Sequence, residues 1–98
     1  MSIQPDIEAI FEFILKKEVH DGYRPSHMVK ENCLTTGLHH YYKDKNIDGE
    51  VKGTITFITP EEYPACLWIG KKIEMFDGSK LIGYATVLKI FNAVLNRD

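Results

Sequence analysis

Two apolar runs joined by an Asp77-Gly78 turn constrain this chain more than any other feature of its sequence. Residues 73–76 and 81–91 are largely apolar, and Gly78 can take the positive φ of a tight hairpin turn without a Cβ clash. The second run is rich in β-branched and aromatic residues, and apolar residues on both of its faces predict a strand buried on both sides for much of its length. Gly83 lies inside this run and indicates a bulge, a bend or a close approach of another backbone.

Further strands are predicted before this hairpin. The clearest covers residues 51–59, where apolar and polar side chains alternate, and residues 33–42 predict another. Residues 22–25, Gly-Tyr-Arg-Pro, predict an extended segment leading into residues 26–30, because proline fixes its own φ and disfavours a helical residue before it. Residues 6–17 fit a strand or one face of a helix, and their aromatic and β-branched content favours the strand.

Little helix is expected between the strands. Thr59-Pro60-Glu61-Glu62 has the residues of a helix start, with threonine at the N-cap and proline at the first position, but Pro64 limits the helix to one turn. The sole tryptophan, Trp68, lies in a short apolar segment, and we expect it in the core; the alternative is an exposed tryptophan, which would mark an interface. Strands about every ten residues, separated by glycine and proline, predict an all-β fold, a small antiparallel barrel or sandwich.

Length and composition predict a single domain over residues 1–98, with residues 1–5 and 93–98 as flexible ends, although Val94 and Leu95 could pack. The net charge of −2 gives no electrostatic support for non-specific nucleic-acid binding. Cys33 and Cys66 are too few for a disulfide scaffold, so we expect free thiols in a reducing compartment. No apolar run approaches the roughly 20 residues of a membrane span, and we predict a cytoplasmic protein without a membrane partner.

Four stretches in order resemble the C-terminal β-barrel domain of bacterial elongation factor Tu, its third domain. They are residues 22–25, 51–59, 70–73 and 76–90. That family has Gly-Tyr-Arg-Pro before a long strand, and an Arg-Glu-Gly-Gly-Arg turn before a strand that contains a glycine. The resemblance covers about residues 7–91 and implies an antiparallel Greek-key barrel of six or seven strands, the first of them within residues 6–17. The chain has no Gly-x-x-x-x-Gly-Lys-Ser/Thr phosphate loop, so we do not expect a GTPase.

The resemblance also implies a binding turn. In elongation factor Tu the third domain helps to hold the T stem of aminoacyl-tRNA and packs on the nucleotide domain. Its tRNA-facing Glu-Gly-Gly-Arg corresponds here to Asp77, Gly78, Ser79 and Lys80, and Phe76 stands where the family has an arginine. We therefore expect Phe76, Asp77, Gly78 and Lys80 to belong to a binding surface, and the departures from the family favour a protein partner over tRNA.

Aromatic and basic residues elsewhere extend this candidate surface. Tyr23 and Arg24 lie in the Gly-Tyr-Arg-Pro segment, while Tyr41 and Tyr42 end a predicted strand just before Lys43 and Lys45. Tyrosine and arginine are enriched at binding hot spots, and aromatic rings can stack on bases. The alternative is that Tyr23 packs on the barrel and Arg24 pairs with an acid.

No metal site, cofactor or catalytic centre is predicted. His39 and His40 would point to opposite faces of a strand and cannot both reach one ion without a bulge, although His20, His27 and Cys33 lie nearby in sequence. Neither cysteine has a recognisable activating context. The Glu61-Glu62 pair is explained by a helix N-terminus, which favours negative charge.

Two functions follow from these observations. The first is a non-catalytic protein-binding module that mimics the third domain of elongation factor Tu, for instance an immunity or antitoxin protein that neutralises a translation-targeting toxin. Its partner would be a toxin or a component of translation. The alternative is a module that binds a tRNA or other RNA stem through Arg24, Lys80 and Lys89.

Overall fold

The computed structural model describes residues 4–14, 20–42 and 50–97 of the chain. Strands dominate, and the two short 3₁₀ helices are single turns. None of the helices in these ranges is long and apolar enough to cross a bilayer. In chain order the elements are β1 (Ile7–Phe13), β2 (Ser26–Lys30), β3 (Cys33–Tyr41), β4 (Glu50–Phe57), η1 (Pro60–Glu62), β5 (Lys72–Asp77), β6 (Lys80–Ile90) and η2 (Ala93–Leu95).

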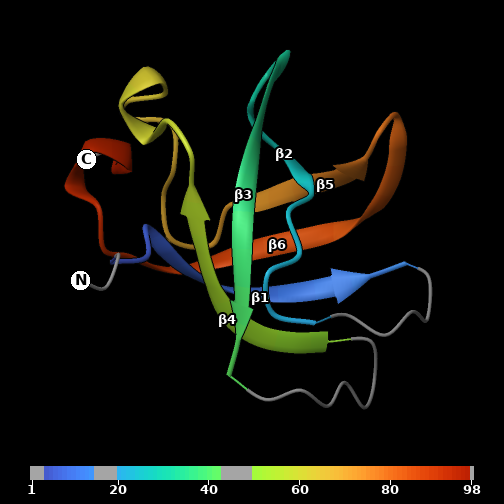
Figure 1. Cartoon of the computed structure of the whole chain (residues 1–98). Helices are drawn as coiled ribbons and strands as arrows, with labels where there is room; N and C mark the ends of the chain where they lie inside the picture. Colours follow the sequence, from blue (N-terminus) through green and yellow to red (C-terminus); the bar gives the residue numbers. More distant parts are fainter. Residues whose placement is uncertain (1–3, 15–19, 43–49, 98) are drawn as a thin grey trace.

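The strands form a closed antiparallel barrel in the order β1-β4-β3-β2-β5-β6, with β6 paired back to β1 (Figure 1). β2, β3 and β4 follow one another as neighbours, while β1 lies beside β4 and β5 returns to lie beside β2. This arrangement of three sequential strands with a fourth returning beside them is a Greek key. The predicted all-β antiparallel barrel is confirmed, with six strands.

One face of every strand points into the barrel, because successive residues of a strand alternate between its two faces. Most of the inward residues are apolar, and many of them are completely removed from solvent. They include Ile7, Ala9, Phe11, Val29, Val51, Ile55, Phe57, Ile73, Met75, Ala85 and Val87. The barrel interior is therefore a packed core.

The β5–β6 hairpin has the predicted turn. Asp77 pairs with Lys80, and Gly78 between them has a φ of +65°. A Cβ on Gly83 would lie 2.1 Å from the backbone oxygen of Glu12 in β1, so the predicted close backbone approach is present. Burial of β6 on both faces was predicted wrongly: Tyr84, Thr86 and Leu88 on its outer face are only half-buried, because a single-layered barrel covers one side of each strand.

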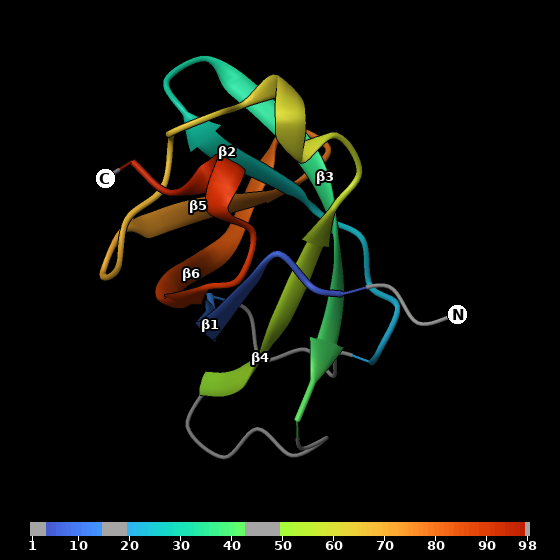
Figure 2. The same cartoon turned by 90° about the vertical axis from the view of Figure 1, so that its left-hand side faces the viewer.

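The barrel has two distinct ends. At the hairpin end, β1 and β3 finish and the β5–β6 turn lies; at the closed end, β4 and β6 finish and residues 58–71 and 91–97 cover the opening (Figures 1 and 2). Within this cover η1 and η2 are in contact, and the amide of Leu67 donates to the carbonyl of Leu95 at 2.9 Å. Leu67 and Leu95 are 0% and 1% exposed and complete the core at this end.

The C-terminal segment differs from the flexible end that we expected. Asn92 accepts a hydrogen bond from Val94 and so caps η2, and the amide of Arg97 donates to the carbonyl of Leu67 at 2.8 Å. Residues 93–97 are therefore held against the barrel by hydrogen bonds, and Leu95 packs, as the alternative prediction for this segment stated. Residue 98 lies outside the described ranges. η1 begins at Pro60 after Thr59 and lasts one turn, as predicted.

Asp6 joins the start of the chain to this end. Its carboxylate accepts hydrogen bonds from the amide of Phe57, at 2.7 Å, and from the side chain of Asn92, at 2.8 Å. Its backbone carbonyl accepts from the amides of Phe91 and Asn92. A single aspartate thus connects the beginning of β1 with the segments that follow β4 and β6.

Candidate functional site

The predicted binding residues all belong to segments at the hairpin end. Arg24, Asp77 and Lys80 are exposed there, with Gly78 at the tip of the turn, and Phe76 is half-buried beside Ser26 of β2. Tyr23 is half-buried against the core, as the alternative for that residue foresaw. Burial and the nearby charge of Asp77 raise the pKa of its hydroxyl. The fold therefore brings segments around residues 22–25 and 76–80 together.

Tyr41 was assigned wrongly to this surface. It is 5% exposed, because it shares the inward face of β3 with Thr35 and His39, and burial raises the pKa of its hydroxyl. Its neighbour Tyr42 points outward, is 48% exposed and donates a 2.6 Å hydrogen bond to Glu8. The alternation of side chains along β3 separates the two tyrosines, so only Tyr42 is available to a partner.

Inside the barrel, His27, His39 and Tyr41 form a buried triad. The Nε2 atoms of the two histidines are 2.8 Å apart, and Nδ1 of His39 is 2.7 Å from the Tyr41 hydroxyl. Nδ1 of His27 lies 3.3 Å from the carbonyl of Thr35. One proton assignment satisfies every group: Tyr41 donates to His39, His39 donates through Nε2 to His27, and His27 donates through Nδ1 to the carbonyl.

Aromatic rings surround this triad and keep water away from it. Phe11 lies 4.4 Å from the ring of His39, and Phe57 meets His27 edge to face. Burial lowers the pKa of His27 to about 4 and that of His39 to about 2, so both imidazoles are neutral near pH 7. The triad is an internal structural element, and no side of it is open to a ligand.

The histidine pair predicted to diverge does so. His39 points inward, whereas His40 points outward and makes a 2.7 Å ion-pair contact with Asp21 when protonated. Both nitrogens of His27 and of His39 are used by hydrogen bonds within the barrel. Among the residues that the structure describes, no group of three or more potential metal ligands comes together.

Several large apolar side chains on the segments that cover the closed end are in contact with solvent; Ile14, Leu34 and Tyr42 are also exposed, outside these segments. We call Ile58, Trp68, Ile69, Phe91 and Val94 the closed-end surface; their exposures range from 39% to 69%. Our prediction that Trp68 is a core residue is wrong: Cys66 and Leu67 are buried, and the next two residues, Trp68 and Ile69, face solvent. Ile58 and Ile69 were not predicted as surface residues, and Val94 was named only as a residue that could pack.

Two cations lie over the ring of Trp68. The Nζ of Lys71 is 4.6 Å and the Cζ of Arg97 is 4.8 Å from the ring centroid. Lys71 also donates to the carbonyls of Val29 and of Cys66, the latter at 2.7 Å, which fixes the 66–71 turn against β2. Burial lowers the pKa of this lysine. Contacts of this kind hold the indole in one orientation although it faces solvent.

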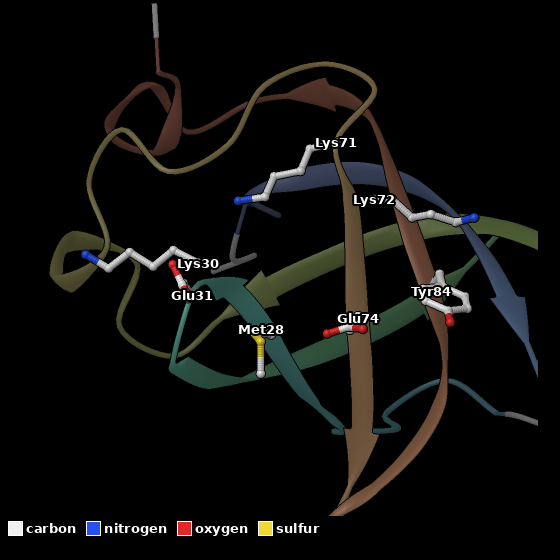
Figure 3. Close-up of a pocket in the computed structure, with 7 residues that line it drawn as sticks. All are labelled: Met28, Lys30, Glu31, Lys71, Lys72, Glu74 and Tyr84. Carbon is white, nitrogen blue, oxygen red and sulfur yellow. The ribbon is translucent and has the colours of Figure 1, made fainter.

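A hollow of about 350 Å³ lies on the outside of β2, β5 and β6 next to this end, lined by Met28, Lys30, Glu31, Lys71, Lys72, Glu74 and Tyr84 (Figure 3). Lys30 and Lys71 extend toward the same side in Figure 3. Lys72 points the other way, 4.8 Å from the ring of Tyr84 and 3.8 Å from a carboxylate oxygen of Glu12. Lys71 thus adds positive charge beside Trp68, and the hollow itself holds lysines together with the carboxylates of Glu31 and Glu74.

The chain was compared with models of protein families and with curated proteins. No model of a protein family matches the chain, and no curated protein matches it. The candidate sites therefore stand on their own chemistry. Alternation could not have revealed the closed-end surface, because Cys66 and Leu67 are both buried while Trp68 and Ile69 are both exposed.

Proposed function

We propose that this chain is a non-catalytic protein-binding module whose main contact surface is the closed end. The observation that carries the proposal is the grouping of Ile58, Trp68, Ile69, Phe91 and Val94, all at least 39% exposed, on the segments that cover this end. Exposed apolar side chains gathered in one region are typical of protein interfaces, and tryptophan is the residue most enriched at their hot spots.

We further propose that the module acts by mimicry of the third domain of elongation factor Tu. The resemblance of the sequence and the Greek-key barrel support this hypothesis, although fold alone does not establish function. In its most concrete form, the protein is an immunity or antitoxin protein that binds a toxin which otherwise docks on the translation factor.

An RNA-stem-binding module is the second candidate, and the geometry supports it less. Arg24 and Lys80 are exposed at the hairpin end, but Lys89 lies at the far end of β6, about 30 Å from Lys80 at the rise of a strand. Exposed acids, Asp21 and Asp77, accompany the two cations. This mixture of charges gives phosphates a weak electrostatic attraction.

The test is affinity capture from native cell extract at low and moderate salt, with proteins and RNA identified together. Wild type is compared with Trp68→Ala at the closed end and with an Arg24→Gln/Lys80→Gln variant at the hairpin end, after circular dichroism shows that each variant is folded. We expect one protein to be retained at both salt concentrations, lost with Trp68→Ala and kept by the double variant.

A different pattern of capture would contradict the proposal. RNA retained at low salt only, and lost with the double variant, would support the RNA-stem function. A protein captured equally by wild type and Trp68→Ala would move the contact surface away from the closed end. Capture of neither protein nor RNA would reject both functions.

A further inference from the structure

Trp68 faces solvent, and two cations, Lys71 and Arg97, lie over its ring. Arg97 lies over the indole, 4.8 Å from the ring centroid by its Cζ, and its backbone is held by the hydrogen bond to Leu67. A guanidinium stacked on an aromatic ring keeps its N–H donors at its edge, where they can meet a carboxylate in a two-point contact. Such an arginine is ordered before a ligand arrives, so little side-chain entropy is lost on binding.

The positive charges of this cluster are not neutralised by the ion pairs within residues 4–14, 20–42 and 50–97. Those pairs join His40 to Asp21 and Lys72 to Glu12. Arg97, Lys71 and Lys30 take part in neither. Lys30 and Lys71 also lie close enough to Cys66 for their charges to favour its thiolate, although burial has the larger effect and raises the pKa of that thiol. Lys71 and Arg97 thus lie over the same indole, and Lys30 lines the same hollow as Lys71, together with Glu31 and Glu74.

Apolar groups border the cations directly. Ile69 follows Trp68 in the chain and is 61% exposed, and Val94 in η2 is 39% exposed. The carbonyl of Val94 accepts from the amide of Ala65 at 2.8 Å, which places η2 beside the segment that leads to Trp68. A ligand that fits this neighbourhood needs carboxylates for the cations and aliphatic or aromatic groups for the apolar side chains.

From this chemistry we propose that the Trp68–Arg97 cluster, with Lys71 and Lys30, binds an acidic peptide segment that also carries apolar residues. The inference rests on the proposed protein-binding function and names the chemistry of the partner. A carboxylate of the partner pairs with Arg97, and an adjacent apolar side chain packs on Trp68 and Ile69. A nucleic acid would satisfy the charges but would leave the aliphatic side chains of Ile69 and Val94 without a matching group.

The test is selection of binders from a displayed library of random twelve-residue peptides on wild type, Arg97→Gln and Arg24→Gln. Arg24 is the matched control, because it is an exposed arginine at the opposite end. We expect wild type and Arg24→Gln to enrich peptides rich in aspartate or glutamate beside apolar residues. Arg97→Gln should bind the same peptides about tenfold or more weakly, and Arg97→Lys should fall between, since lysine keeps the charge and loses the two-point contact.

The sole tryptophan provides a second readout, because its fluorescence reports events at the cluster itself. The best selected peptide should change Trp68 emission saturably, and its glutamine-for-glutamate counterpart should bind about tenfold or more weakly. Peptides without enrichment of acids, or equal binding by Arg97→Gln, would overturn the inference, as would tighter binding of a duplex RNA at this cluster. The capture experiment tests protein binding through Trp68→Ala and does not depend on the charge of the partner. The peptide experiment can therefore fail, and reject an acidic partner, while the capture experiment still supports protein binding.

Discussion

At the hairpin end, the inside of the barrel is filled by rings that hydrogen-bond to one another, whereas at the closed end it is filled by aliphatic side chains. His27, His39 and Tyr41 form the first arrangement, and all three belong to strands. Leu67 and Leu95 form the second, and both come from segments outside the strands. The first depends on the direction of each hydrogen bond, and the second depends only on shape and apolar area.

The outer surfaces of the two ends also differ. The hairpin end exposes charged side chains of both signs, including Arg24, Asp77 and Lys80, beside Ile14 and Tyr42. The closed end exposes the apolar side chains of the closed-end surface, with cations over the indole of Trp68. Segments that close a barrel from outside must face the core on one side and solvent on the other, and here the outer side carries these apolar side chains among charged ones such as Glu61 and Glu62. This difference favours the closed end as the surface that a protein partner covers.

The largest expected effect is at the hairpin end, where Gly83→Ala should prevent stable folding. The new Cβ would lie 2.1 Å from the backbone oxygen of Glu12, and neither backbone can move without breaking the β1–β6 ladder. Gly78→Ala is the control, because nothing lies within 4 Å of a Cβ there and only its φ of +65° is unfavourable, at a cost of about 1 kcal/mol. Urea unfolding measures the stability of both variants. A stable Gly83→Ala barrel would show that the pairing of β1 with β6 can shift to accommodate the added Cβ.

The next largest effect is expected from acid, which should lower the free energy of unfolding through the buried histidines of the triad. Burial lowers the pKa of His27 to about 4 and of His39 to about 2, below the ordinary 6.5, so the unfolded state binds more protons as the pH falls through 6.5. Each histidine then removes about 2 kcal/mol of stability at pH 5, or about 4 kcal/mol for both.

Chemical denaturation from pH 8 to pH 5 measures this loss. A free energy of unfolding that stays constant over this range would contradict the proton assignment of the triad.

The closed end should respond to loss of volume instead. Leu95→Ala removes a side chain that is 1% exposed and should cost about 2–5 kcal/mol through lost burial and a cavity. Val94→Ala, at a neighbouring residue that is 39% exposed, should cost much less. Thermal unfolding of the two variants separates packing at this end from its outer surface; equal losses would mean that Val94 is also part of the core.

The smallest effects come from a matched pair on β3. Tyr41→Phe leaves Nδ1 of buried His39 without its donor and should cost about 1–3 kcal/mol. Tyr42→Phe removes an exposed hydrogen bond to Glu8 and should cost no more than about 0.5 kcal/mol. Urea unfolding of both variants tests whether the inner and outer faces of β3 differ as described, and equal costs would contradict the difference.

Local patterns predicted the strands well, because turns and alternation are properties of neighbouring residues. The Asp77-Gly78 turn, the alternation in residues 51–57 and the close approach at Gly83 all appear in the structure. Residues 6–17 were ambiguous, because apolar residues there satisfy both periods; pairing of β1 with both β4 and β6 makes Ile7–Phe13 a strand, and residues 15–17 lie outside the described residues. Lys43 and Lys45 lie outside the described residues.

The candidate sites were harder to predict, because they depend on which residues meet across the barrel. Nothing in the sequence shows that residues 27, 39 and 41 share an interior, since the pairing of β2 with β3 decides it. Likewise, Arg97 reaches Trp68 only because the C-terminal segment crosses the closed end. Tyr41 was misplaced because the face that a residue occupies depends on the register of its strand. Trp68 was misplaced because it lies between β4 and β5, in a segment whose course over the closed end has no local sequence signal.

Closure of the barrel also sets the order in which the protein can be completed during synthesis. Ile7 pairs with both Ile55 and Ile90, so the first strand of the barrel to be synthesised has one partner made three strands later and another made five strands later. Until then, the apolar side of β1 and both of its backbone edges are open to other nascent chains. Among the strands of the barrel, β1 therefore needs protection by chaperones for longest, and it is covered on both edges only when β6 has been made.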